Sequence, residues 1–407
     1  MRRLLAVLTL SALAATGILV AGPATAEPDC RKSPQSGPCR PKPATTPTPT
    51  VTVEASPTVE PTSATPAPTL TTTTPGGTPT PTGSATQTGS IAPVGKLLIK
   101  LGQDIPTTAQ FAANRALYES RPFDGWAIHT RAQVFTPTTA TSQATYATEL
   151  AAFPTGLTNS THNFLRVLFL QPLDFVSDAQ WATMAQNAAN LAAAARASGR
   201  QFDGLLIDNE FYGSGNLWND VNQPLAQRRG EQIGRAIAGV WPEATVLILY
   251  GPWVSDPKTA AAFGSGYNDV AWANEGMGPF AYGLAAGTYG SSARFVDGGE
   301  AYGPRTATDF ANIKAWQKTG LANNSALIGD PTAYKAKVDA SIGVYDRDMR
   351  NAYALFSPSM LTTLLGTALA SVDSYVWLYT ETYEWGASQS GKPVVPQTYL
   401  DAVAAVR

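Results

Sequence analysis

Eight short apolar runs, each rich in β-forming residues, recur along the second part of the chain and alternate with stretches of helical spacing. Such an alternation is typical of parallel strands joined by helices, which bury the strands on both faces. The eight runs are residues 96–100, 125–129, 164–170, 204–208, 245–250, 293–297, 341–345 and 374–379. The clearest helical segments are residues 178–198, 227–240, 307–319 and 358–370.

The number of runs favours a closed barrel. The part of the chain from Ser90 to Arg407 is about 320 residues long, which suits a single (β/α)8 TIM barrel with insertions. An open doubly wound sheet is the alternative, but no glycine-rich phosphate-binding loop follows any of the runs. The seventh run is the least regular, and residues 326–329 could take its place.

A partial internal repeat agrees with a barrel of repeated βα units. The segments RPFDG (121–125) and RQFDG (200–204) each connect a helical stretch to an apolar run. Both are interpreted as the same helix-to-strand connection, in which Asp-Gly supplies the turn conformation.

The N-terminus has the pattern of an export signal. Arg2 and Arg3 precede an apolar run over residues 4–20, and Ala24-Thr25-Ala26 is typical of a signal-peptidase site. A membrane span is the competing interpretation, but the run is short and ends in the cleavage pattern. Residues 1–26 are therefore predicted to be a cleaved signal peptide, and the protein to be secreted.

Residues 27–89 are predicted to be a disordered Pro/Thr-rich linker. Their composition offers too little apolar surface to offset the entropy of ordering, and the prolines favour extended conformations. Cys30 and Cys39 are the two cysteines of the chain, and in an exported protein they form either a small disulfide loop or two free thiols. The linker is interpreted as a spacer that holds the barrel at a distance.

The net charge and the spacing of possible metal ligands limit the binding partners that we expect. The formal charge of −2 argues against electrostatic binding of nucleic acid or acidic lipid. His129 and His162 have no nearby cysteine that would complete a zinc pattern, and no calcium-loop spacing occurs. We expect no metal, no cofactor and a monomer.

The fourth run ends abruptly in acid, in the segment FDGLLIDNE (202–210). Residues two apart on a strand share a face, so Leu206, Asp208 and Glu210 should point the same way. Barrel enzymes build their active sites at the carboxyl ends of the strands, which predicts a paired-carboxylate site here. The non-catalytic interpretation is a rim carboxylate that pairs with an arginine such as Arg131.

The last run shows a second pattern. Tyr375, Trp377, Tyr379 and Glu381 alternate with aliphatic residues, so one face of this strand should present rings and a carboxylate to the barrel mouth. Aromatic rings stack on the C–H faces of sugars, and carboxyl pairs serve as acid and base in glycoside hydrolysis.

Acidic and aromatic residues dominate the other strand ends as well. Trp272 is a further stacking candidate, whereas Trp126, Trp181 and His162 are expected to be structural. The predicted substrate-binding residues are His129, Asn209, Tyr250, Trp253, Asp297, Glu300, Trp377, Tyr379, Glu384 and Trp385.

From residue 91 to residue 407 the chain resembles a TIM-barrel glycoside hydrolase. Asn209-Glu210 at the end of the fourth strand is similar to the Asn-Glu of the large retaining clan, in which the glutamate is the acid/base. That clan takes its nucleophile from the seventh strand, whereas Glu381 follows the eighth. DGLLIDNE (203–210) also resembles the chitinase-type Asp-Gly-x-x-x-Asp-x-Glu signature, although Leu206 stands at a position that is normally Asp.

Both resemblances imply that Glu210 is the proton donor, and the charge of Asp208 could raise its pKa. Glu381 is the preferred nucleophile or base, followed by Glu300 and then Asp297. The sequence thus predicts a secreted glycoside hydrolase that cleaves a polysaccharide or cell-wall glycan. The alternatives are a non-catalytic carbohydrate-binding barrel and a metal-dependent deacetylase-type hydrolase.

Overall fold

A computed structural model describes residues 95–212, 217–218, 221–263, 276–387 and 391–407. The predicted signal peptide, the linker with Cys30 and Cys39, and Trp272 lie outside the described residues. Within the described part, no helix is both long and apolar enough to cross a membrane.

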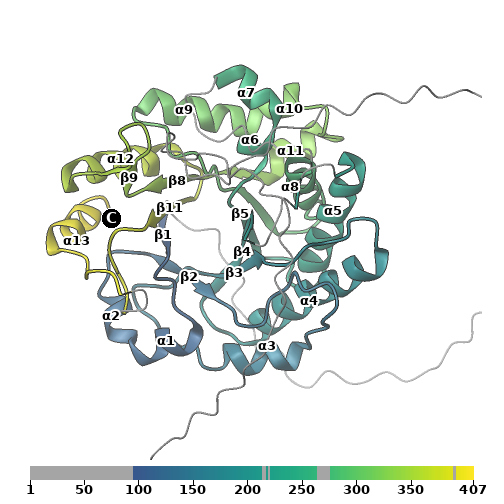
Figure 1. Ribbon diagram of the computed structural model, residues 1–407, viewed down its shortest axis with the longest axis horizontal. Coiled ribbons are helices and arrows are strands. Elements are labelled where there is room, and N and C mark those ends of the chain that lie inside the picture. Colours follow the sequence, from purple (N-terminus) through teal and green to yellow (C-terminus); the bar gives the residue numbers. More distant parts are fainter. Residues whose placement is uncertain (1–94, 213–216, 219–220, 264–275, 388–390) are drawn as a thin grey trace, which may run out of the picture. The chain divides into compact units, whose positions relative to one another are not determined.

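The described strands close into a parallel barrel. Nine strand segments pair in the order β7-β6-β5-β4-β3-β2-β1-β11-β8, and Figure 1 shows them at the centre of a ring of helices. Their bounds are β1 Leu97–Gly102, β2 Gly125–His129, β3 Asn163–Phe169, β4 Phe202–Phe211, β5 Thr245–Ile248, β6 Arg294–Asp297, β7 Val338–Ala340, β8 Ile342–Tyr345 and β11 Tyr375–Thr380.

The two ends of this order belong to one stretch of chain. β7 pairs with β6 and β8 pairs with β11, while Ser341 alone separates β7 from β8. Residues 338–345 therefore act as one interrupted strand that closes a barrel of eight. The predicted TIM barrel is confirmed, and the seventh strand contains residues 341–345 rather than 326–329, which form no strand.

Helices follow most strands and pack outside them. The four predicted helical segments are found as α4, α5, α9 with the adjoining π-helical turn η2, and α12. A short hairpin, β9 Arg347–Asp348 and β10 Ala354–Leu355, extends from the end of β8. The helices are α1 Thr108–Ala113, α2 Arg115–Glu119, α3 Gln143–Leu150, α4 Asp178–Ala197, α5 Gln223–Val240, α6 Pro252–Ser255, α7 Pro257–Phe263, α8 Met277–Ala286, α9 Ala307–Ala315, η2 Trp316–Gly320, α10 Leu321–Asn324, α11 Pro331–Lys337, α12 Pro358–Ser371 and α13 Gln397–Ala404.

The aromatic face of β11 points into the barrel, as predicted. The Tyr375 hydroxyl donates to Asp203 on β4 at 2.8 Å, and the Trp377 indole donates to the carbonyl of Gly298 beyond β6 at 2.8 Å. These contacts cross the barrel and fix its interior in layers. Tyr379 forms the next layer, at the mouth.

The repeated FDG segments owe their glycines to close packing rather than to a turn. Neither Gly125 nor Gly204 has a positive φ. A Cβ on Gly125 would lie 1.7 Å from the carbonyl oxygen of His162, and a Cβ on Gly204 would lie 1.8 Å from that of Thr245. Each glycine therefore allows the next strand to approach, which corrects the expected turn role.

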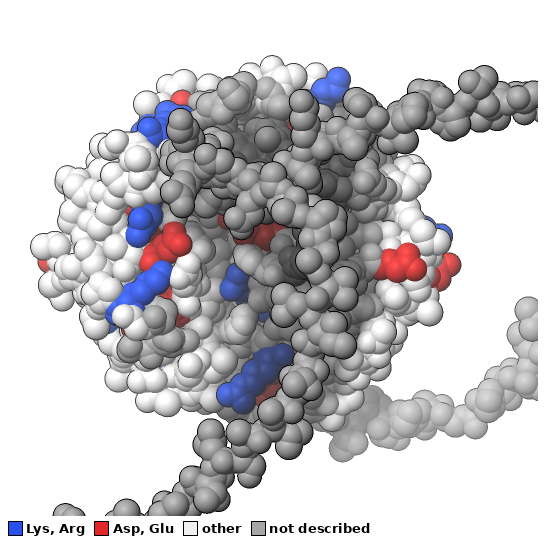
Figure 2. Space-filling view, viewed as in Figure 1, with Lys and Arg blue, Asp and Glu red and all other residues white. Residues whose placement is uncertain are grey.

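The charged side chains on the face in Figure 2 are interspersed, with acidic and basic groups close to one another. Among the described residues this face shows no extended area of a single sign.

Candidate active site

A cavity of about 180 Å³ lies at the carboxyl ends of the strands. This is the edge at which barrel folds place their binding sites. Side chains from five strands, β1, β3, β4, β8 and β11, and from segments that follow β4, β5, β6, β8 and β11 line the cavity. They are Leu101, Arg166, Asp208, Glu210, Tyr212, Leu249, Tyr250, Glu300, Tyr302, Tyr345, Met349, Tyr353, Tyr379 and Glu381.

Asp208 and Glu210 share the inner face of β4, as the alternation predicted. Asp208 is 1% exposed and accepts hydrogen bonds from two guanidinium nitrogens of Arg166 on β3, that from Nε being 3.1 Å long. The partner of the acidic strand end is therefore Arg166 and not Arg131. Tyr212, just beyond β4, donates its hydroxyl to Glu210 at 2.5 Å, and that hydroxyl also lies 3.1 Å from Asp208.

Glu300 reaches the same cavity from the loop after β6. It is 6% exposed, and Oε1 accepts a hydrogen bond of 2.5 Å from the Tyr302 hydroxyl. Its other oxygen, Oε2, is buried and has no hydrogen-bond partner in the described structure. An unpartnered oxygen of a buried carboxyl group disfavours the ionised form.

The pKa values of Glu210 and Glu300 are both raised. Burial, and then the charge of Asp208, raise the pKa of Glu210, although the hydroxyls of Tyr212 and Tyr250 oppose the shift. Burial, and then the charges of Glu210 and Asp208, raise the pKa of Glu300 well above its usual range. Because each ionised carboxylate disfavours ionisation of the other, protonation of one glutamate favours the ionised form of the other.

Glu381 lies at the same mouth, just after β11. It accepts hydrogen bonds from the Tyr345 hydroxyl and from the Gln103 amide, the latter at 3.1 Å. Its backbone N–H donates to Asp346 at 3.2 Å, which fixes the start of the loop.

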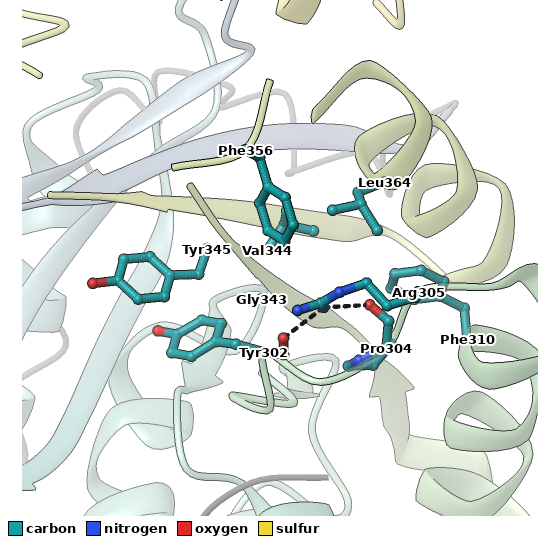
Figure 3. A pocket seen from close by; sticks show the side chains of 9 residues that line it. All are labelled: Tyr302, Pro304, Arg305, Phe310, Gly343, Val344, Tyr345, Phe356 and Leu364. Carbon is teal, nitrogen blue, oxygen red and sulfur yellow. Dashed lines mark hydrogen bonds between the residues drawn. The ribbon is translucent and has the colours of Figure 1, made fainter. Parts of the chain in front are cut away.

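Two neighbouring tyrosines connect the Glu300 and Glu381 sides of the cavity. The rings of Tyr302 and Tyr345 have centroids 5.0 Å apart, and Figure 3 shows their hydroxyl groups pointing the same way. Tyr302 holds Glu300 and Tyr345 holds Glu381, so this ring pair fixes the positions of two carboxylates. On the other side of these rings, Arg305 donates to the backbone carbonyls of Tyr302 and Pro304, each at 2.8 Å.

Six of the predicted site residues line this one cavity. They are Asp208, Glu210, Tyr250, Glu300, Tyr379 and Glu381.

The predicted tryptophan platforms do not reach the cavity. Trp253, Trp377 and Trp385 are at most 1% exposed, so none presents a ring face to a ligand. Trp377 lies in the barrel interior, and Trp385 packs against Phe123 with ring centroids 5.5 Å apart. Trp126 and Trp181 are core residues, as expected.

Four further candidates have other positions. The Asn209 side chain bonds both backbone groups of Tyr250, at 2.9 and 3.0 Å, and so ties β4 to the end of β5. Burial raises the pKa of Asp297 to about 7, and its carboxylate holds the backbone N–H of Trp253 at 2.7 Å. Glu384 is fully buried, and His129 is half-buried beside Arg166 without lining the cavity.

Several lining residues were not predicted, and some had a signal in the sequence. Arg166 interrupts an otherwise apolar strand, and a lone charge on such a strand indicates a buried partner. Tyr302 lies two residues after Glu300, and Tyr345 is the last residue of β8, but the carboxylates to which they donate lie in loops. Met349 and Tyr353 come from the β9–β10 hairpin, which no pattern indicated.

No group of three or more His, Cys, Asp or Glu side chains is placed to hold a metal ion within the described residues.

No protein-family model and no curated protein matches the sequence. Similar solved structures include an endo-β-mannanase/endo-β-glucanase of Prevotella bryantii, with 10% identity over 76% of this chain and a TM-score of 0.40; the match spans about half, 48%, of that protein. A broad-specificity endoglucanase from Clostridium cellulovorans has 12% identity over 76% of this chain and 93% of its own, with a TM-score of 0.43. A β-mannanase from the blue mussel Mytilus edulis has 12% identity, coverage of 76% and 91%, and a TM-score of 0.37.

Proposed function

We propose that the protein is a secreted glycoside hydrolase that cleaves a polysaccharide or cell-wall glycan with carboxyl groups at the barrel mouth. The observation that carries the proposal is the pair Glu210 and Glu300, two carboxyl groups with raised pKa values in one cavity. Glycoside hydrolysis needs one protonated and one ionised carboxyl group at the same time. Two coupled glutamates supply both forms when one of them is protonated and the other is ionised.

The surroundings of the two glutamates favour one assignment of roles. Glu210 accepts hydrogen bonds from two tyrosine hydroxyls, which stabilise its ionised form, whereas Glu300 accepts one and is more deeply buried. Glu300 therefore retains its proton and acts as the general acid, and Glu210 is the ionised nucleophile or base. The sequence resemblance instead implied the donor role for Glu210, and Glu381 was the preferred nucleophile or base in the sequence analysis.

A survey of substrates tests the activity itself. The purified full chain is assayed for reducing-sugar release from α- and β-glucans, mannans, chitin, chitosan and peptidoglycan. We expect at least one glycan to be cut, and expect its cleavage to be lost in Glu210→Gln and Glu300→Gln. Retention of a glycan without any cleavage would support a carbohydrate-binding barrel in place of an enzyme.

Tyr212→Phe tests the ionised role of Glu210. Removing the hydroxyl removes a hydrogen bond that lowers the pKa of Glu210, so this pKa should rise. A reaction that needs ionised Glu210 fails as the pH falls through this pKa, and the acidic limb of the kcat/KM profile should therefore move to higher pH.

The control is Tyr289→Phe, which changes a tyrosine that does not line the cavity and should leave both limbs in place. A shift of the basic limb alone in Tyr212→Phe would return the donor role to Glu210.

Secretion is tested by the N-terminal sequence of the exported protein. Cleavage after Ala26 would give a mature chain that begins at Glu27.

A further inference from the structure

The cavity carries an excess of negative charge. Four acidic side chains line it, and Arg166 is the one cationic side chain among the described lining residues. Arg166 is already engaged by Asp208. Even when Glu300 is protonated, the carboxylates of Asp208, Glu210 and Glu381 face a single guanidinium group. The other lining residues are tyrosine, leucine and methionine.

The cations nearby do not cancel this excess. Lys392 approaches Glu381, but its ammonium group contacts the backbone carbonyl of Glu381 and the side chain of Gln103. Lys100 is fully buried in a pair with Asp104 at 2.5 Å, and Arg347 donates to Thr382 at 3.1 Å. None of these three residues lines the cavity.

Glu300 Oε2 adds an independent sign of a missing partner. This oxygen belongs to a side chain that is 6% exposed, borders the cavity and has no hydrogen-bond partner in the described structure. Buried carboxylate oxygens are normally satisfied by a donor, and a donor that is also a cation would offset the repulsion among the carboxylates.

We propose that the sugar bound in this cavity carries a protonated amino group, as the 2-amino-2-deoxy sugars of deacetylated polysaccharides do. The inference rests on the proposed function and specifies its substrate class. An ammonium group can donate to Glu300 and a second carboxylate at once, and tyrosine rings around it add cation–π attraction. Uronic acids would be repelled by the same charges.

The lining disfavours an N-acetylated ring for a different reason. An acetamido group is bound by amide or hydroxyl partners for its C=O and N–H, and by an apolar wall for its methyl group. The described lining contains no Asn, Gln, His or Trp side chain, and four of its six tyrosine hydroxyls, those of Tyr212, Tyr250, Tyr302 and Tyr345, donate to carboxylates.

Monosaccharides test the inference without any bond to cleave. Glucosamine, glucose, N-acetylglucosamine and glucuronic acid are titrated into the full chain by calorimetry at mildly acidic pH, together with the galactose counterparts. An amine should bind at least about tenfold more tightly than its hydroxyl counterpart. The attraction of one added charge pair near a protein surface exceeds the binding free energy that corresponds to a tenfold change in affinity. The preference should shrink as salt is added.

A substitution in the cavity gives a second readout. In Glu381→Gln the amine preference should fall severalfold, whereas Glu243→Gln, which changes a glutamate outside the cavity, should retain it.

The failures of the two proposals can be told apart with matched polymers. Cleavage of chitosan-type or polygalactosamine-type chains in preference to their hydroxyl and N-acetyl counterparts supports both the glycosidase proposal and the amino-sugar inference. Preferential cleavage of a neutral or N-acetylated glycan overturns the amino-sugar inference and leaves the glycosidase proposal standing. If no polymer is cut and no monosaccharide binds, both fall.

Discussion

Replacing Glu300 by glutamine is expected to lower kcat/KM on an unactivated polysaccharide by about 10²- to 10⁴-fold, the range that a general acid contributes. The expectation follows from the burial of Glu300, its unpartnered oxygen and its proximity to the ionised Glu210 and Asp208. A glutamine has the same shape but cannot give up a proton to the departing sugar oxygen. The measurement is steady-state hydrolysis of the best substrate found in the survey.

The leaving group separates a general acid from a nucleophile. An aryl glycoside with an acidic phenol needs little protonation, so Glu300→Gln should lose much less activity on it than on the polysaccharide. Glu210→Gln should be inactive on both, because the ionised carboxylate is needed whatever the leaving group is. If Glu210→Gln alone retains activity on the aryl glycoside, the two roles are reversed.

Glu381→Gln completes this comparison. If it removes activity on both substrates while Glu210→Gln is rescued by the aryl leaving group, the pair predicted from the sequence is correct and Glu300 only tunes the pKa of Glu210. Asp401→Asn, in the exposed part of α13, is the matched control and should change neither rate.

The barrel could be predicted because its signals are local. Apolar runs, helical spacing and acidic strand ends depend on neighbouring residues, and the alternation on β4 and β11 gave the inward faces correctly. Glu210 and Glu381 were placed at the mouth by that same alternation. The interruption at Ser341 could not be predicted from the sequence. A strand that pairs with one neighbour before the interruption and with another after it has only a short, irregular apolar run.

The sequence did not show which tyrosine and tryptophan rings face the cavity and which are buried. A ring beyond a strand end can face the cavity or pack beneath it, and the choice depends on where the loop turns. Trp253 is drawn inward because Asp297 holds its backbone, and Trp385 because Asp104 accepts its backbone N–H at 2.6 Å. Tyr302 faces Glu300 through loop geometry that only the folded chain defines, whereas Tyr345 is the last residue of β8.

Gly204→Ala is expected to destabilise the barrel by at least about 3 kcal/mol, the upper part of the range for an overpacked site. The new Cβ would lie 1.8 Å from the carbonyl oxygen of Thr245 and 2.7 Å from its nitrogen, and these backbone atoms cannot move without opening the ladder between β4 and β5. Since β4 carries Asp208 and Glu210, any remaining folded protein should also lose activity. The measurement is chemical unfolding followed by circular dichroism.

Gly239→Ala is the matched control for this substitution. Gly239 lies in α5, has no positive φ and would have no atom within 4 Å of an added Cβ. Alanine is the better helix former by about 1 kcal/mol, so this variant should be as stable as the parent or more stable. If Gly204→Ala were as stable as Gly239→Ala, β4 and β5 would not approach as closely as described, and the shared inner face that brings Asp208 and Glu210 to the mouth would need another origin.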